Sequence, residues 1–497
     1  MFKPEDIKAL IDADRTSDKK LRARVGQRYY EGKHDILQYR MFYFNADGKL
    51  VEDKTRSNMK IPHPFFTELV DQLPAYMLSF DENPIRAKDT ADGLQERLDE
   101  YFDDDFWSEI GEQIAGAYTK GFDYLYGYKN ELGRLAFQHA DGLGVVEVRE
   151  KDTDAGCAAM IYWYTDRVDK GKKEIIRIQV HTDKMITYYV QNGTDGRVVL
   201  DLDQPVNPRP NVVYKDAEGN LYHDPKGLGF LPFWRLDYNE RQASGLEPIK
   251  PIIDDYDLMK CGLSNNLQDF DHPIYAVRGF DGHNMDELQA NLRTKKIVGT
   301  GDAGGLDILT VEIPVEARKA NLEEDEKNIY RFGMGFNSSQ AGDGNITNVV
   351  IRSRYTLLDL KANKMEKQLK KMLRKIIRVV LKEINETEGT DYQMADVYFD
   401  FVRNVPTNEQ ENVQNELTRA QTRQLEVNTL LNAAASIGEE AVLKALCDLF
   451  ELDLDEIKAQ LEEAAQESPE AAQRLLDQVV TDDDEQEAEA STAEPAE

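Results

Sequence analysis

The longest regular pattern of apolar positions runs from residue 350 to residue 386, a stretch that contains neither Gly nor Pro. Its larger apolar residues recur at intervals of three, four or seven: Leu358, Met365, Leu369, Met372, Ile376 and Val380. At about 100° per residue these positions fall on one face of a helix. The pattern therefore predicts a single helix, which at about 1.5 Å per residue is roughly 55 Å long.

The segment before this helix has the opposite character. Residues 337–347 are rich in Gly, Ser and Asn and contain no bulky side chain before Ile346. Such residues favour turns rather than packed elements. We expect a mobile loop that leads directly into the long helix.

The N-terminal part of the chain is predicted to be mainly helical. A first helix extends from Glu5 to about Gln38, with Gly32 placed to end it, and a polar hairpin-like stretch follows. Residues 58–66 are expected to be extended, because positions before proline avoid the helical conformation. A helix capped by Thr67 comes next, with Pro74 as a local irregularity.

Helical spacing continues over residues 92–128, and the period then changes to two over residues 135–234. Alternation of apolar and polar residues is typical of strands, and the turn residues between them indicate hairpins. Two hairpins are predicted, which join 160–165 to 174–181 and 185–190 to 197–202. The region is interpreted as an antiparallel meander.

Two further helices, over 246–270 and 316–332, flank a compact insert that contains strands, 274–313. The first helix has an apolar stripe made of Ile252, Tyr256, Met259, Leu263, Leu267 and Phe270. Its other face is acidic and polar, with Asp254, Asp257, Asn265, Gln268 and Asp269. The helix therefore has one apolar face and one acidic and polar face.

After the long helix the sequence predicts a short strand over 397–402. A helix capped by Thr407 extends through Leu431, and shorter helices continue to residue 480. The last residues, 481–497, include eight acidic residues and no basic one, which predicts a disordered tail. The fold class expected from these elements is α+β, mainly α.

Charge changes the interpretation of the long helix. The chain of 497 residues carries a net charge of −32, yet residues 351–382 contain eleven Lys and Arg against only Asp359 and Glu366, a local charge of +9. An acidic protein repels nucleic acid over its surface as a whole, so any contact with DNA must be local. The basic residues either pair with acidic surface of this chain or a neighbouring copy, or face phosphate. The candidates are Arg352, Arg354, Lys361, Lys364, Lys371 and Lys375.

Other patterns argue against an enzyme, a cofactor or a metal site. Residues 299–304 match GxGxxG, but a strand-like segment follows them instead of the helix that dinucleotide binding needs. The acidic run 103–105 has no partner for Mg²⁺ nearby in the sequence. The three cysteines, at 157, 261 and 447, are far apart and indicate neither disulfides nor zinc. No signal peptide or membrane span is expected.

Several strings, in their order along the chain, resemble the portal proteins of tailed double-stranded DNA bacteriophages, in the family typified by portals of Bacillus phages. They are residues 29–36, the segment from Asn58–Pro62 to Val70–Gln72 with Tyr76 and Asn83–Pro84 after it, Leu231–Phe233 to Asn239, Asp254–Tyr256, and Phe401–Pro406. The resemblance spans most of residues 20 to 470. One departure follows Gly344, where Asn345–Val350 replaces the small Ser-Gly-Ala-type residues of many relatives.

The resemblance implies a portal fold with named regions and a ring, usually of twelve copies, at one capsid vertex. The regions are a wing over 1–243, a first stem helix over 244–270, a clip over 271–315, a second stem helix over 316–336, a tunnel loop over 337–350, a long tunnel helix of the wing over 351–390, a helical crown over 391–480 and the acidic tail over 481–497. The acidic faces of the stem helices would then be available to line the channel.

The resemblance also implies sites and partners. The tunnel loop would meet DNA in the channel through Asn337, Ser338, Ser339, Gln340, Asp343, Asn345, Thr347 and Asn348. Double-stranded DNA would pass during packaging and ejection, pumped by the terminase large subunit, and a head-tail adaptor would dock later. Major capsid and scaffolding proteins would be further partners. The protein would lie in the virion, and in the host cytoplasm during assembly, with no membrane partner and no catalytic role.

Two other classes of protein stay open from the sequence. One is a nucleic-acid-binding enzyme or regulator that uses the basic helix over 351–382 as its binding face. The other is a structural ring or scaffold through which no DNA passes.

Overall fold

The computed structural model describes residues 2–403, with gaps at 55, 89, 132, 151–155, 169, 170, 172, 194, 195, 216–219, 270–273, 279–304, 310–312 and 338–347, and isolated positions between 417 and 444. The chain divides into two compact units. The first comprises Met1–Asn345 and Val349–Pro406, and the second comprises Ile346–Asn348 and Thr407–Glu497. In the second unit the described positions are helical.

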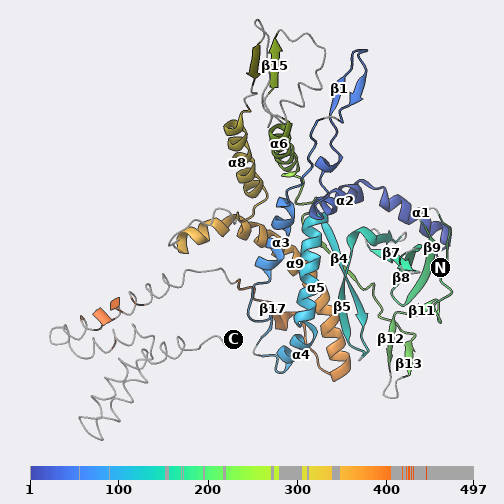
Figure 1. Cartoon of the computed structure of the whole chain (residues 1–497). Coiled ribbons are helices and arrows are strands. Elements are labelled where there is room, and N and C mark those ends of the chain that lie inside the picture. The colour runs from blue at the N-terminus through green and yellow to red at the C-terminus, as the bar shows by residue number, and fades with distance from the viewer. Residues whose placement is uncertain are drawn as a thin grey trace. The chain divides into compact units, whose positions relative to one another are not determined.

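The first unit combines helices with several antiparallel sheets, and strand pairs project at its extremities (Figure 1). The helices are α1 (Pro4–Arg15), α2 (Asp18–Tyr30), α3 (Phe65–Met77), α4 (Leu94–Tyr101), α5 (Asp104–Lys120), α6 (Lys250–Asp269), α8 (Val315–Phe332) and α9 (Asn348–Glu388). Single 3-10 turns occur at Asp35–Gln38, Gly142–Gly144 and Met394–Asp396. Within the described parts of the chain, no helix combines the length and the apolar character needed to cross a membrane.

The main sheet is antiparallel and has the strand order β10-β9-β8-β7-β6, with β11 also paired to β9. Its strands are β6 (Val145–Arg149), β7 (Cys157–Val168), β8 (Lys173–His181), β9 (Met185–Asn192), β10 (Val198–Leu200) and β11 (Arg209–Pro210). β7 with β8 and β9 with β10 are the two predicted hairpins, which confirms the antiparallel meander. Period-two alternation identified them because one face of each strand is buried against α1.

Smaller sheets complete the unit. β4 (Phe122–Lys129) lies between β14 (Phe233–Asp237) and β5 (Leu135–Ala140). The remaining strands form antiparallel pairs: β1 (Phe42–Phe44) with β2 (Leu50–Glu52), β12 (Val212–Lys215) with β13 (Leu221–Asp224), β15 (Ile274–Arg278) with β16 (Gly305–Leu309), and β17 (Val397–Phe399) with β3 (Ile85–Ala87). The β15–β16 pair agrees with the strands expected inside the insert.

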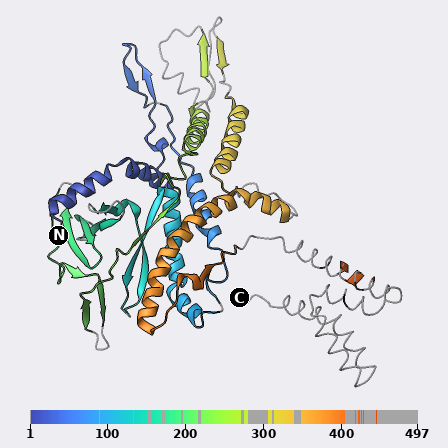
Figure 2. The same ribbon diagram turned by 180° about the vertical axis from the view of Figure 1, so that it is seen from behind.

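The largest core lies among α3, α5 and α9, which run side by side in both views (Figures 1 and 2). α9 contributes every apolar residue of the predicted stripe to this core: Leu358, Met365, Leu369, Met372, Ile376 and Val380. The prediction of a single long helix is confirmed, since α9 has 41 residues.

Several predicted boundaries are wrong. The helix expected over 246–270 begins at Lys250, and the helix expected over 92–128 is broken between α4 and α5. The first helix is interrupted after α1 because the Ser17 side chain accepts a hydrogen bond from the Lys20 N–H and starts α2 as a new helix. Residues 122–128 form β4, because Gly121 adopts a left-handed conformation at the end of α5 (φ 92°) and stops the helix. Thr67 does not cap α3, which begins at Phe65; its hydroxyl donates to the Tyr30 carbonyl instead.

The run Asp103–Asp105 has a structural role. The Asp103 side chain accepts a hydrogen bond from the Phe106 N–H and so caps α5, while Asp104 and Asp105 lie in the first turn. Carboxylates at this end of a helix are stabilised by its dipole. Residues 299–304 and the chain from 404 onward, except the isolated positions noted above, lie outside the described residues.

Candidate functional site

α9 presents a basic face opposite its buried stripe. The exposed cations of the helix are Lys364, Lys367, Lys371, Arg374, Lys375, Arg378 and Lys382. Three of the six predicted candidates, Lys364, Lys371 and Lys375, follow one another at intervals of seven and four residues and therefore share one side of the helix. We call these three residues the α9 lysine row. The side chains of Arg352 and Arg354 lie outside the described part of the chain.

Lys361 differs from the other candidates because it is enclosed within the chain. It is 1% exposed, and its ammonium lies 3.3 Å from the Leu69 carbonyl oxygen and 3.2 Å from that of Gly333. The ring of Tyr118 lies 4.5 Å from its Nζ. Burial lowers the pKa of Lys361 to about 7. This corrects the expectation that Lys361 faces phosphate or a neighbouring copy: its buried ammonium donates to a carbonyl of α3 and to one at the end of α8.

The two carboxylates of the basic stretch have a common partner. Arg403 pairs with Asp359 at 2.8 Å and also with Glu366, while Lys370 lies 2.6 Å from Glu366. These contacts hold the segment after β17 on the surface of α9. Sequence reasoning missed Arg403, although two isolated acidic residues seven positions apart on a basic helix were a signal that a cation docks between them.

Both ends of the predicted loop are held by α3. The Gln72 side chain forms two hydrogen bonds with the backbone of Phe336: it accepts from the N–H at 2.9 Å and donates to the carbonyl at 2.7 Å. The Phe336 ring stacks on Tyr355 of α9 with centroids 4.8 Å apart, and Tyr355 stacks on Tyr76 of α3 at 5.8 Å. α3 therefore fixes where the chain leaves α8 and where it enters α9.

Of the predicted loop residues, Asn337 is described, and its side-chain amide donates to Glu326 at 3.0 Å. Asn348 is the first residue of α9, and its side chain lies outside the described part. The other predicted loop residues, Ser338, Ser339, Gln340, Asp343, Asn345 and Thr347, also lie outside it.

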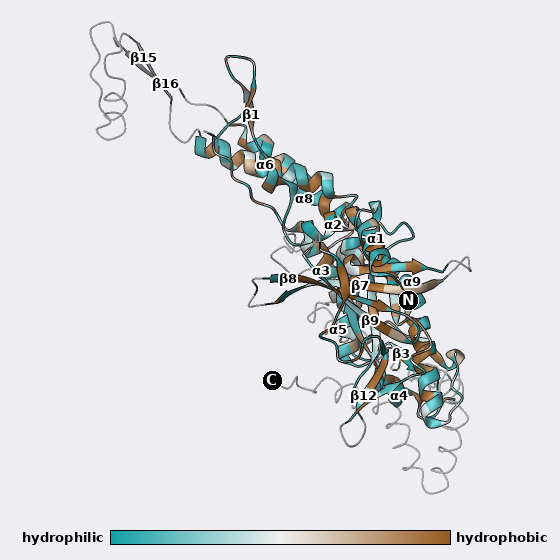
Figure 3. Ribbon diagram, turned by 90° about the vertical axis from the view of Figure 1, so that its right-hand side faces the viewer, coloured by the Kyte–Doolittle hydropathy of each residue, from teal (hydrophilic) through white to brown (hydrophobic). Residues whose placement is uncertain are grey.

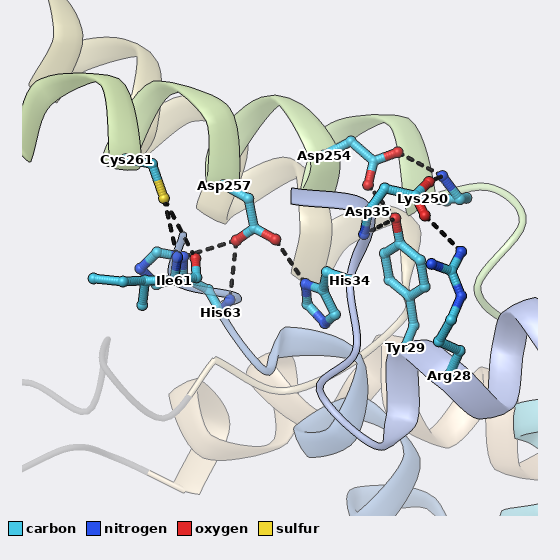
Figure 4. Close-up of polar contacts among 10 residues, drawn as sticks. All are labelled: Arg28, Tyr29, His34, Asp35, Ile61, His63, Lys250, Asp254, Asp257 and Cys261. Carbon is cyan, nitrogen blue, oxygen red and sulfur yellow. Dashed lines mark hydrogen bonds and ion pairs between the residues drawn. The ribbon is translucent and has the colours of Figure 1, made fainter. Parts of the chain in front are cut away.

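A second polar cluster joins the N-terminal segment to α6 (Figure 4). Asp257 on α6 is fully buried, and its two carboxylate oxygens lie 2.6 Å from His34 Nδ1 and 2.7 Å from His63 Nδ1. The His63 backbone N–H also donates to Asp257 at 2.9 Å. Because a carboxylate only accepts, both Nδ1 atoms donate. Burial opposes ionisation of Asp257, but the hydrogen bonds from His34 and His63 outweigh it and hold its pKa below the usual range.

The cluster continues toward the start of α6. Lys250 Nζ lies 2.6 Å from Asp35 and 2.6 Å from Asp254, and the Tyr29 hydroxyl donates to Asp254 (Figure 4). Arg28 pairs with Asp35 at 2.5 Å. Burial favours loss of the Lys250 proton, but the bonds to Asp254 and Asp35 outweigh it and raise the pKa of Lys250. α2 and the segment that follows it are thereby tied to the first turns of α6.

These contacts correct the expectation that the whole polar face of α6 is available to line a channel. Asp257 and Asn265 are buried, because residues 57–63 cross this face, and Asn265 accepts from the Met59 N–H at 2.7 Å. Neither residue is available to line a channel in this chain. Of the predicted apolar stripe, Leu263 is buried whereas Leu267 is exposed. Among the described residues, no group of three or more His, Cys, Asp or Glu is arranged to hold a metal ion.

Comparison with known proteins gives one consistent result. A family model described as "Phage portal protein, SPP1 Gp6-like" matches residues 11–469. The portal protein of Bacillus phage SPP1 is 28% identical over 347 residues, which are 69% of this chain and 66% of that protein, slightly less than two thirds of its length. The portal protein of Clostridium phage phiCD119 is 26% identical over 417 residues, which are 82% of this chain and 87% of that protein.

Proposed function

Because this chain belongs to the SPP1 Gp6-like family of phage portal proteins, we propose that it closes into a ring of about twelve copies at one vertex of a phage capsid. Double-stranded DNA passes through the axial channel of this ring during packaging and ejection. The terminase large subunit and later a head-tail adaptor dock on the ring, and capsid and scaffolding proteins surround it. The observation that carries the proposal is the family match over residues 11–469.

The regions expected from the sequence take their roles within this proposal. α6 and α8 are the stem helices, residues 271–315 the clip, 337–350 the tunnel loop and 391–480 the crown, and the wing comprises residues 1–243 and the long helix α9. Two features of the described residues support the assignment. α6 and α8 pack against each other as a pair, and α3 holds Phe336 just before segment 337–347 and contacts α9 beyond it through Tyr355.

The charge distribution suits a conduit. Each phosphate that a protein neutralises adds affinity, and affinity would slow the passage of DNA. The chain has a net charge of −32, and the exposed cations along α9 offer phosphate a local strip on this acidic protein. We propose that the α9 lysine row faces either phosphate or the acidic surface of a neighbouring copy, and that the chain has no catalytic role.

The test is the mass and the shape of the purified protein. Negative-stain images are expected to show an annulus with an axial hole, and sedimentation is expected to give a mass near twelve times that of one chain. A compact monomer under assembly conditions would overturn the proposal.

The loop is tested separately. Removal of residues 340–346 is expected to leave rings intact, because the anchoring residues Gln72, Phe336 and Tyr355 are retained, while DNA packaging or retention falls. Normal packaging by this variant would contradict the assignment of the loop.

A second function is favoured by the exposed basic face of α9. If the protein is a nucleic-acid-binding enzyme or regulator, the isolated monomer should bind DNA below micromolar concentration with a strong dependence on salt. Weak binding by the monomer together with ring formation would exclude this alternative.

A further inference from the structure

The β1–β2 hairpin exposes an unusual amount of apolar surface. Phe42 is 53% exposed, Phe44 is 73% exposed and Leu50 is 59% exposed, and Phe44 pairs directly with Leu50 across the two strands. Tyr43 and Val51 on the opposite face are exposed as well. Figure 3 shows the hydrophobic residues on this projection. A two-stranded hairpin alone is marginally stable in water, and a contiguous apolar patch marks an interaction surface.

The base of the hairpin is fixed on one side of α6. The Ser57 N–H donates to Asp269 of α6 at 3.0 Å, next to the bond between Met59 and Asn265. A small cavity of ≈ 110 Å³ lies between the hairpin base and α6, and Tyr39, Met41 and Leu258 are among its lining residues. The hairpin is thus presented from a fixed position beside the stem helix (Figure 1).

Three exposed cations lie at the same base, beside the carboxylates of Glu52, Asp53 and Asp269. Arg40, Lys54 and Arg56 are exposed where the two strands meet the arm that leads to α6. The guanidinium of Arg40 lies 3.9 Å from Glu52, at the outer limit of an ion pair. We call Arg40, Lys54, Arg56 and the apolar residues of β1 and β2 the hairpin flank.

The side of α6 that contacts α8 has the opposite charge. Asp255 of α6 and Asp325 of α8 both lie near the Asn321 amide, at 3.5 and 3.3 Å, and Glu323 and Glu324 are exposed on the same stretch of α8. Burial and the neighbouring charges of Asp255 and Glu324 raise the pKa of Asp325 to about 6. We call this group of carboxylates the α8 flank. Its negative charge is concentrated, so a cation placed beside it would be stabilised.

A ring joins two different surfaces of each copy, because the contact is head-to-tail. Copies that each carry a net charge of −32 repel one another, so a cationic and apolar surface opposite an acidic one is needed to offset that repulsion. The hairpin flank and the α8 flank have this complementary character. They also belong to two different sides of α6, as a head-to-tail contact requires.

We propose that the hairpin flank of one copy docks on the α8 flank of the next copy, with Lys54 and Arg56 opposite Glu323 and Glu324. The proposal rests on the ring put forward above. It adds which surfaces meet and assigns the exposed hairpin to a second copy of this chain. The apolar residues of β1 and β2 would lose their contact with water in the same step.

Charge reversal tests this pairing. Variant X carries Lys54→Glu and Arg56→Glu, and variant Y carries Glu323→Lys and Glu324→Lys. Each variant alone brings like charges together at every contact, so at equal protein concentration we expect the ring fraction in sedimentation to fall at least tenfold. A one-to-one mixture of X and Y brings opposite charges together at every contact and is expected to recover rings in which the two chains alternate. A single chain with all four changes should recover them as well.

The control is Lys184→Glu with Lys226→Glu, which makes the same change of charge at exposed positions near the sheet. Circular dichroism and the melting temperature of each monomer show whether it is folded, and Y tests the contact independently if X folds poorly. Rings formed by X and by Y as readily as by the control would overturn the pairing. Intact rings of X that fail to bind a scaffolding or capsid protein would overturn it too, by assigning the hairpin to that partner. Absence of rings in the unmodified protein would overturn both this pairing and the proposed function.

Discussion

Asp257 shows how much a single buried carboxylate contributes to the first unit. It accepts hydrogen bonds from two imidazoles and one backbone N–H, and it is fully buried. Asp257→Asn would place an amide N–H₂ against a donor, so we expect a loss of roughly 2–3 kcal/mol in the free energy of unfolding. Chemical denaturation at neutral pH measures it.

The pH dependence of that variant follows from the same carboxylate. Because the pKa of Asp257 is held below its usual range, its stabilising contribution is present above the ordinary aspartate pKa of about 4 and disappears as the pH falls through the lowered value. The difference between the variant and the unmodified protein should therefore shrink on acidification. Asp269→Asn, at the exposed end of the same helix, is the control and should change stability by less than about 1 kcal/mol.

Lys361 gives a pH effect of the same sign in the alkaline range. Its pKa in the folded chain is about 7, whereas an unfolded lysine titrates near 10.5. Between these values the unfolded chain binds the extra proton, so the contribution of Lys361 to stability rises with pH. Lys361→Met should lack this rise, which is at most about 1.4 kcal/mol per pH unit. Melting curves between pH 7 and 10 measure this rise. The control is Lys364→Met, which removes an exposed lysine and keeps Lys361. A Lys361→Met protein whose stability depends on pH as strongly as that of the control would contradict the lowered pKa assigned to Lys361.

Single residues were the hardest part to predict. Counting charges placed Lys361 with the exposed cations, because the sequence does not show that α3 and the end of α8 cover it. Asp257 was placed on an acidic face available to line a channel for a similar reason, since it lies on the helix face away from the apolar stripe. In both cases the covering segment lies far away in the sequence.

At the scale of elements, α3 anchors the chain on both sides of segment 338–347. Gln72→Ala removes both hydrogen bonds to Phe336, each with a net value of about 1 kcal/mol, so the Phe336 amide should exchange its hydrogen at least fivefold faster. Gln72→Glu keeps the acceptor for that amide and should have a smaller effect. Hydrogen exchange measures both, with the exposed Gln38→Ala as control, and unchanged exchange in Gln72→Ala would contradict the anchoring role.

Elements with a strong local period were predicted well. α9, the β7–β8 hairpin and the β9–β10 hairpin all follow from spacing alone, because each buries one face of regular structure. Boundaries failed where a single residue decides them, as at Ser17 and Gly121. The apolar residues after Gly121 fit a helix or a strand equally well, and only the left-handed turn separates the two.

At the scale of the whole molecule, an experiment can decide whether the α9 lysine row faces phosphate or the acidic surface of a neighbouring copy. All three charges are reversed by Lys364→Glu, Lys371→Glu and Lys375→Glu. If the row faces phosphate, rings should stay intact, and this is the result that we expect. The salt dependence of DNA binding by the ring should then become less steep, since fewer phosphates are neutralised. Sedimentation and DNA binding at several salt concentrations provide the measurement, and loss of rings would instead assign the row to a neighbouring copy.

The family was identified from short strings in their order along the chain, and the match over residues 11–469 confirms that identification. The surfaces that we propose to join copies were not found from the sequence. A hairpin predicted only as polar proved to expose Phe42, Phe44 and Leu50, and only the paired register shows that two of these side chains stand opposite each other.

The hydrogen bonds from His34 and His63 to Asp257 also affect the order in which the chain folds. His34 and His63 precede their carboxylate by 223 and 194 residues. During synthesis, a ribosome therefore releases the two imidazoles long before α6 emerges, and closing so large a loop is slow. The N-terminal residues 34–63 and α6 are thus expected to join late, after the intervening sheet has formed.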